Sequence, residues 1–344
     1  MKRKMTLFLP AVFVATVAVL IVWFTVTKPR VLILHSYHTD YAWVRDINVG
    51  IDHVLAGKAH WDVRHYDMDT KRHPTLVYKN KMGIAARRMI DDWQPDLIIA
   101  IDDDAQQFVA RNYVNRHNVS IVFAGVNLEP KLYHYDTASN VTGVLERIPL
   151  QDLRTALLDY AHLAKRPEAL RVAFVDDLSE TVKGDSKNIK DFDWSPIVLH
   201  SVQLFDTFDQ FKAAVLGLQD KADILMMDGY RRFRRTASDT ALVPPSEVQK
   251  WVAQNSRLPV IGVNSFYSED GGMMAVGTSP QEQGELSARM AVDIIDNHKS
   301  PRDIPIVKGT QYVVTMRASI MADKQFVLPR VYEAAARAAD KYYP

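Results

Sequence analysis

Carboxylates gather where apolar runs of this chain end. The run Leu97 to Ile101 is followed directly by aspartates 102–104, and later apolar runs end at Asp177 and Asp228. A carboxylate accepts charge-assisted hydrogen bonds from ammonium and hydroxyl groups, and it is also a ligand for hard cations such as Mg²⁺. Two chemistries are therefore open: recognition of an amine-bearing solute or a polyol, and metal-dependent hydrolysis or phosphoryl transfer.

The catalytic alternative has little further support in the sequence. The chain has no glycine-rich phosphate loop, no Gly-x-Ser-x-Gly nucleophile turn and no His-Glu-x-x-His motif. His35, His38 and Asp40 are close in sequence, but no second cluster at ligand spacing accompanies them. We therefore predict a binding protein, not an enzyme, with no cofactor and no metal.

The elements that position these carboxylates are predicted from the apolar pattern. Apolar runs without alternation indicate strands buried on both faces, and they begin at Val31, Leu97, Ile121, Val172, Ile224 and Val260. Segments 75–93, 105–116 and 246–255 carry apolar residues at helical spacing. Strands that alternate with helices predict an α/β fold with parallel sheets, in which ligands bind at the carboxyl ends of the strands.

The order of these elements occurs twice along the chain. In the first half, a strand, an acidic loop, a helix and another strand lead to Gly125-Val126-Asn127, and in the second half the same order leads to Gly262-Val263-Asn264. Such an internal repeat predicts two lobes of like topology with a cleft between them. The length of 344 residues fits two such domains.

Composition and the N-terminus indicate the compartment. The 42 basic and 41 acidic residues give no overall field that would recruit nucleic acid, and the absence of cysteine excludes disulfides and a lipid-modified cysteine. Lys2, Arg3 and Lys4 precede an uncharged run, residues 5–27, long enough to cross a bilayer. The positive-inside rule then predicts an extracytoplasmic, periplasmic protein tethered to the inner membrane by residues 5–27. The alternative is that residues 1–28 are a cleaved signal peptide rather than a signal anchor.

After Arg30 the chain resembles the periplasmic substrate-binding proteins of ABC transporters, the family that includes the tryptophan and tyrosine binders. The resemblance is carried by segments that match the family in order and spacing: Ile121 to Val126, Asn140-Val141-Thr142-Gly143, Gly271 to Gly277, a helix from Ala288 to Asn297, and a strand from Tyr312 to Thr315. It implies a type I periplasmic-binding fold, with two Rossmann-like lobes joined by a three-strand hinge. It also implies that residues 29–144 plus 277–311 form lobe 1, and residues 145–276 plus 312–344 form lobe 2.

The chain departs from this family pattern at one place. Family members commonly have small and hydroxyl residues where this chain has aspartates 102–104. Three acids would repel a carboxylate, since two unit charges about 4 Å apart interact by several kcal/mol at an effective dielectric of about 20. We therefore expect an amine-bearing, amino-acid-like or polyol ligand.

The predicted ligand contacts lie at the strand ends, where aspartates would accept hydrogen bonds and aromatic rings would stack. They are Ser36, Tyr37, Asp103, Asp104, Gly125, Asn127, Asp177, Asp228, Tyr230, Asn264 and Phe266. Trp43 has helical spacing and is predicted to be a core residue. The resemblance implies a monomer that delivers its ligand to an inner-membrane ABC permease. A sensor that feeds a signalling partner is the alternative, because His35-Ser36-Tyr37 with Trp43 also resembles the opening of extracytoplasmic sensor domains.

Overall fold

The computed structural model describes residues 12–17, 28–166 and 168–344. Of the predicted membrane segment, residues 5–27, residues 12–17 are described and are helical, and the remainder lies outside the described residues. Among the described residues, no helix has both the length and the apolar character needed to span a membrane.

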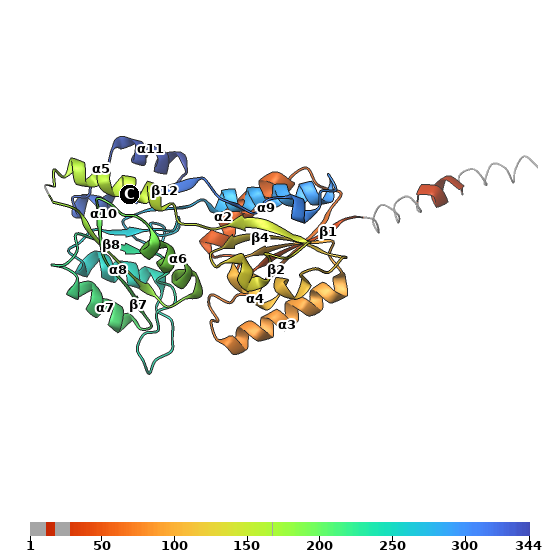
Figure 1. The fold of residues 1–344 in the computed structure, drawn as a ribbon, viewed down its shortest axis with the longest axis horizontal. Coiled ribbons are helices and arrows are strands. Elements are labelled where there is room, and N and C mark those ends of the chain that lie inside the picture. Colours follow the sequence, from red (N-terminus) through yellow and green to blue (C-terminus); the bar gives the residue numbers. More distant parts are fainter. Residues whose placement is uncertain (1–11, 18–27, 167) are drawn as a thin grey trace, which may run out of the picture.

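Two lobes lie side by side, each built around its own sheet (Figure 1). The first sheet has the order β11-β5-β4-β3-β1-β2 and consists of β1 (Arg30–His35), β2 (Asp62–Asp67), β3 (Leu97–Ile101), β4 (Ser120–Val126), β5 (Val141–Leu145) and β11 (Val307–Lys308). The second has the order β13-β12-β10-β9-β8-β6-β7 and consists of β6 (Arg171–Asp177), β7 (Val198–Phe205), β8 (Ile224–Met227), β9 (Val260–Gly262), β10 (Met274–Thr278), β12 (Tyr312–Arg317) and β13 (Tyr342–Tyr343).

The strand orders confirm the internal repeat. The order β2-β1-β3-β4-β5 in the first sheet corresponds, strand for strand, to β7-β6-β8-β9-β10 in the second. The pairing is parallel, as predicted, except between β10 and β12, which run antiparallel. Every residue of β3 and β8 is buried, as expected for apolar runs without alternation.

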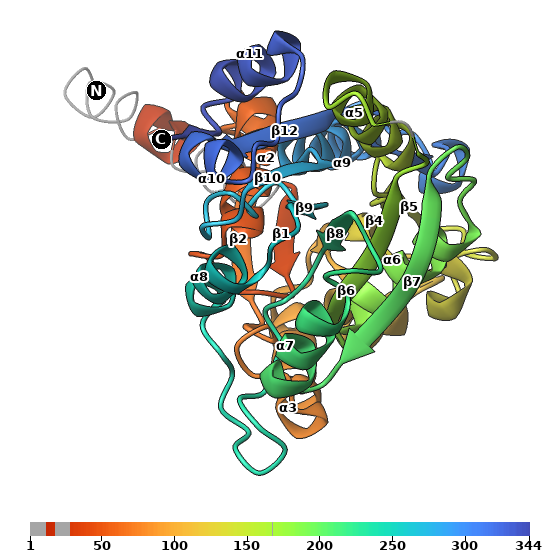
Figure 2. The same cartoon turned by 90° about the vertical axis from the view of Figure 1, so that its left-hand side faces the viewer.

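Helices cover both sheets (Figures 1 and 2). The first lobe holds α2 (Ala42–Leu55), α3 (Leu76–Trp93), α4 (Asp103–Phe108), α9 (Pro280–Ile295) and the 3-10 turns η1 (Ala110–Tyr113), η2 (Pro130–Tyr133) and η3 (Pro301–Asp303). The second holds α5 (Leu150–Leu163), α6 (Glu180–Asp191), α7 (Phe208–Gly217), α8 (Pro245–Asn255), α10 (Ala318–Asp323) and α11 (Arg330–Ala338). The helix predicted over residues 105–116 is two shorter pieces, because the backbone leaves the helical region at Val109 (φ −130°).

The chain passes between the lobes three times, as the resemblance implied. The crossings are residues 146–149 between β5 and α5, Ser279 between β10 and α9, and residues 309–311 between β11 and β12. As a result α9 packs on β3, β4 and β5 of the first sheet, although it directly follows β10 of the second sheet in the chain. The predicted domain limits themselves stay a prediction.

Helices α2 and α9 lie side by side in both views, and glycines allow this contact (Figures 1 and 2). A Cβ atom on Gly50 of α2 would lie 2.0 Å from the carbonyl oxygen of Gln281, and one on Gly284 of α9 would lie 2.1 Å from that of Ile47. Both distances are far inside van der Waals contact with backbone. The close approach of the two helices therefore requires residues without a side chain at these positions.

Candidate functional site

The carboxyl ends of the two sheets face each other, with a cavity of about 20 Å³ between them. The cavity is lined by Tyr37, Tyr41, Trp43, Lys71, Asp102 and Glu146 of the first lobe and its crossing, and by Thr181, Asp228, Gly229, Asn264 and Phe266 of the second. A space of this size holds a water molecule. A solute can therefore enter only when the lobes separate or a lining side chain leaves.

Three carboxyl groups of the lining are buried with little compensation. Asp102 lies against the indole N–H of Trp43, and Asp228 lies against the carboxyl group of Asp185, with which it can share a proton, but neither aspartate forms an ion pair among the described residues. Burial raises the pKa of Asp102, Glu146 and Asp228 well above the usual ranges, and neighbouring carboxylates raise it further, while Lys71 opposes the shift at both aspartates. Such groups can donate a hydrogen bond when protonated and accept one from an ammonium when ionised.

The local fold frees Asp102 from a capping role. Asp102 precedes the first residue of α4 and is its N-cap residue, but its side chain makes no capping hydrogen bond. The hydroxyl of Ser36 accepts from the backbone N–H of Ala105 (2.7 Å) and donates to the carbonyl of Ile101 (2.7 Å) instead. Asp102 has φ +66°, and it is flanked by Gly125 (φ +64°), where a Cβ would lie 3.2 Å from Asp102 Oδ1.

Aromatic rings form one wall of the cavity. The ring centroids of Tyr41 and Phe266 are 5.4 Å apart, and those of Tyr37 and Tyr41 are 5.5 Å apart. The guanidinium of Arg231 lies over Tyr41 (4.7 Å) and Phe266 (4.6 Å) and is neutralised by Asp270. The wall therefore suits a cationic or apolar group.

Contacts across the cleft show that the lobes are closed on each other. Asn127 of the first lobe donates through Nδ2 to Asp185 Oδ2 of the second (3.3 Å). On another side of the cleft, Arg45 of α2 donates to both oxygens of Glu269 (3.0 and 2.9 Å). Opening would break these hydrogen bonds and would widen the cavity.

Several residues predicted from the sequence lie at the cleft. Tyr37, Asp228, Asn264 and Phe266 line the central cavity. Asp103 and Asp104 line a neighbouring hollow of about 560 Å³, to which the second lobe contributes Glu180 and Arg232. Asp104 is paired there with Lys79 (2.8 Å). Contact of any of these residues with a ligand stays a prediction.

The other predicted residues lie behind the lining, where they are bonded to protein. Asp177 accepts from the backbone N–H groups of Ser179 (2.8 Å) and Arg232 (2.8 Å), and the hydroxyl of Tyr230 donates to Asp270 (2.6 Å). The backbone N–H of Gly125 donates to Gln283 Oε1 (3.0 Å), while Ser36 and Asn127 make the contacts with Ala105 and Asp185 described above. These five residues shape the lining rather than face the cavity.

Six residues that line the cavity are not among the ligand contacts predicted from the sequence: Tyr41, Lys71, Asp102, Glu146, Thr181 and Gly229. Asp102 was recognised as one of the three aspartates after the run Leu97 to Ile101, but only Asp103 and Asp104 were predicted as contacts. Lys71 lies in the loop after β2, a strand end by the same rule that found the aspartates, and Glu146 directly follows β5. Searching every strand end for charged residues would have found both. Trp43, predicted to be core, is buried and also lines the cavity.

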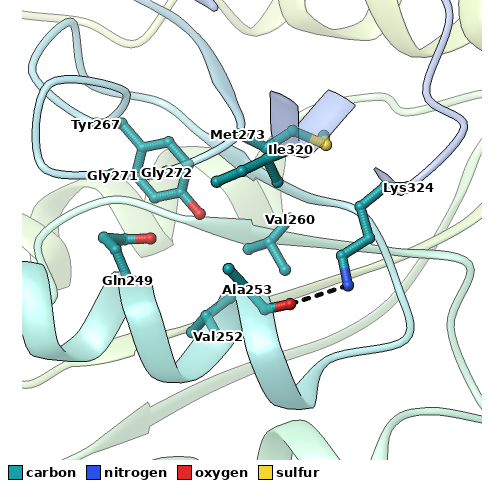
Figure 3. A pocket seen from close by; sticks show the side chains of 10 residues that line it. All are labelled: Gln249, Val252, Ala253, Val260, Tyr267, Gly271, Gly272, Met273, Ile320 and Lys324. Carbon is teal, nitrogen blue, oxygen red and sulfur yellow. Dashed lines mark hydrogen bonds between the residues drawn. The ribbon is translucent and has the colours of Figure 1, made fainter. Parts of the chain in front are cut away.

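A second gap, of about 10 Å³, lies wholly inside the second lobe (Figure 3). Figure 3 shows Gln249 and Val252 of α8 facing Gly271, Gly272 and Met273, with Lys324 at one side. Neither polar atom of the Gln249 amide has a hydrogen-bond partner. The gap has room for one water and is away from the strand ends, so it is not the candidate site. Within the described part of the chain, no group of three or more His, Asp or Glu side chains is arranged to hold a metal ion.

No family model matches the chain, and no curated protein matches it in sequence. Solved structures do match its fold. The ABC domain from Streptococcus pneumoniae in complex with L-Trp has a TM-score of 0.66 and 14% identity, with 90% of this chain and 98% of that chain covered. A conserved domain protein from Vibrio cholerae has a TM-score of 0.63, 14% identity and the same coverage. A ligand-free, open substrate-binding protein with adhesive properties from Clostridium difficile has a TM-score of 0.59 and 18% identity, covering 88% and 96%. The type I periplasmic-binding fold is thereby confirmed.

Proposed function

We propose that this protein is an extracytoplasmic solute-binding protein that closes on a small molecule between its lobes and presents it to an ABC permease. The observation that carries the proposal is the closed cavity between the lobes, which buries one carboxyl group from each of them, Asp102 of the first lobe and Asp228 of the second. Among the described residues neither carboxyl group forms an ion pair, and buried charges in proteins are usually paired, so an ammonium group would complete the site. A solute that donates to both would hold the lobes together.

The lining indicates the class of solute. Asp102, Glu146 and Asp228 offer acceptors for an ammonium group or for hydroxyls, and the rings of Tyr37 and Tyr41 offer faces for a cation or an apolar part. An anion would face three carboxyl groups at close range. We therefore favour an amine-bearing solute, with a polyol as the alternative.

Closure is the step that a membrane partner would recognise. A ligand shifts an equilibrium between open and closed forms only by its differential affinity for the two. A solute that donates to both Asp102 and Asp228 has that difference, because the two aspartates belong to different lobes. The comparisons support such a cycle for the fold, since the Streptococcus protein was solved with L-Trp and the Clostridium protein was solved open and ligand-free.

The proposed location and partner rest on the N-terminal pattern and on the fold. The basic residues 2–4 and the uncharged run 5–27 favour export of everything after Lys28, with residues 5–27 as the tether. An ABC permease in the same membrane is the partner that the fold favours. Neither a cofactor nor a catalytic step is part of the proposal.

The test is a ligand screen followed by removal of the two aspartates. Thermal-shift measurements with amines, amino acids and sugars should find a solute that raises the melting temperature, because a ligand at 100 times its Kd stabilises by about 2.7 kcal/mol. Calorimetry on Asp102→Asn, Asp228→Asn and the double variant should then show at least tenfold weaker binding for each. Asp206→Asn, which removes a surface aspartate paired with Arg234 in the second lobe, is the matched control. Unchanged affinity in the double variant would show that this cleft does not bind the solute.

A further inference from the structure

Lys71 projects into the cavity from the loop between β2 and α3. Its ammonium lies 4.6 Å from the ring centroid of Tyr37 and 5.7 Å from that of Tyr41. It shares the cavity with the buried carboxyl groups of Asp102 and Asp228. Two aromatic faces and nearby carboxylates are the surroundings in which proteins bind an organic ammonium ion.

Lys71 makes no direct pair with the acids around it. Among the described residues, no hydrogen bond and no ion pair within 4.0 Å involves its ammonium, although Lys79 at the mouth is paired with Asp104 at 2.8 Å. A lysine that served as a structural counter-ion would form a direct pair, since buried charges in proteins are paired. The ammonium of Lys71 is therefore held by the rings and by the general negative field of the cavity.

The backbone of this loop is fixed, so only the side chain is free to leave. The N–H and hydroxyl of Thr70 both donate to the carbonyl of Ser36 (2.9 and 2.8 Å), and the N–H of Met68 donates to that of His35 (2.9 Å). The four-carbon stem of lysine is flexible and its ammonium is readily hydrated. Rotation of this one side chain out of the cleft would enlarge the cavity by the volume of an alkylammonium chain, without movement of either lobe's sheet.

We propose that Lys71 is a tethered occupant of the solute site: its alkylammonium chain fills the position that a primary alkylammonium group of the ligand takes, and it must leave before the ligand binds. The inference rests on the proposed function and narrows it to solutes that carry a primary amine on an unbranched carbon chain. Because a ligand amine must displace the Lys71 side chain, the occupant lowers the affinity of the site for every amine, and only amines that bind tightly would occupy it.

The test adds back, as a free ligand, the part of the Lys71 side chain that a substitution removes. Lys71→Ala lacks three carbons and the ammonium, which together correspond to n-propylammonium, and Lys71→Ser opens the same space with a polar residue. Calorimetry should show that both variants bind n-propylammonium at least tenfold more tightly than the unaltered protein. Propan-1-ol, a neutral analogue of similar shape, should gain little. Lys79→Ala, which removes the neighbouring lysine paired with Asp104, should gain nothing.

The outcomes separate this inference from the proposed function. If the unaltered protein binds a solute of the screen in an Asp228-dependent manner but neither Lys71 variant gains affinity for n-propylammonium, the occupant is disproved and solute binding stands. Equal gains for propan-1-ol would also disprove it, because filling of space would then explain the effect. If the unaltered protein binds nothing in the screen, the proposed function fails, and the inference about Lys71 falls with it whatever the variants bind.

Discussion

Replacement of Gly284 by alanine should destabilise the first lobe, because α9 would be pushed away from α2. The added Cβ would lie 2.1 Å from the carbonyl oxygen of Ile47, and ordinary van der Waals contact begins at 3.4 Å, so the helices must separate by more than 1 Å. Overpacking of this kind costs about 1–3 kcal/mol. Alanine in a helix gains about 1 kcal/mol over glycine, which offsets part of that cost. The net loss should be up to about 2 kcal/mol for Gly284→Ala, and similar for Gly50→Ala.

Circular dichroism during heating or urea titration measures this loss. For a lobe of this size, 1 kcal/mol corresponds to roughly 2–4 °C, so the melting temperature should fall by up to roughly 8 °C. Gly217→Ala is the matched control, since Gly217 ends α7 and has no atom within 4 Å of an added Cβ. The double variant of Gly50 and Gly284 should lose less than the sum of the single losses, because both act on one contact. A Gly284→Ala protein as stable as Gly217→Ala would refute the inferred helix contact.

Three further predictions concern charge and burial. Burial raises the pKa of Asp103 to about 6, so the protonated carboxyl group stabilises the fold below pH 4, and this stabilisation is lost as the pH rises through 6. The free energy of unfolding in urea should therefore fall by up to about 3 kcal/mol between pH 4 and 7 through this group. Asp103→Asn should remove that fall. Arg45→Ala removes the ion pair with Glu269 across the cleft. This pair is partly exposed and stabilises the closed form by less than about 1 kcal/mol, so small-angle scattering should show a modest increase in open molecules relative to the unaltered protein. In 1 M salt the difference between the two proteins should disappear, because salt screens the pair. Gln249→Leu should leave the free energy of unfolding unchanged or raise it by about 1 kcal/mol, because neither polar atom of the Gln249 amide has a hydrogen-bond partner. Gln283→Leu should lower it by about 1–3 kcal/mol, because the Gln283 amide accepts from the N–H of Gly125 and donates to the carbonyl of Leu145. Urea denaturation of the two variants measures the difference.

The buried strands, and their order along the chain, were predictable because each is an apolar run without polar interruptions. The run Leu97 to Ile101 is apolar at every position, and all five residues are buried in β3. β7 (Val198–Phe205) was not predicted, because it is an edge strand in which no residue is fully buried, so its sequence lacks an apolar run. An apolar run indicates a buried strand, so a strand at the edge of a sheet, where few side chains are buried, lacks this signal.

The site was predictable in place but not in detail. The strand-end rule correctly located the cleft, because parallel strands bring their carboxyl ends to one edge. It could not tell which side chains turn toward the cavity. Tyr230 lies in the loop that follows β8, yet its ring is buried and its hydroxyl donates to Asp270, while its neighbour Gly229 lines the cavity. The cap supplied to α4 by Ser36, from another strand, is a contact between segments 69 residues apart that no local pattern contains.

The three crossings of the chain affect how the protein acquires its structure during synthesis. Helix α9 is needed to cover β3, β4 and β5, yet it is translated about 130 residues after the last of these strands. A nascent first lobe therefore leaves the ribosome with one face of its sheet bare until the chain reaches α9. Export before folding would avoid that exposed stage in the cytoplasm, and apolar sheet faces that wait uncovered are prone to aggregate.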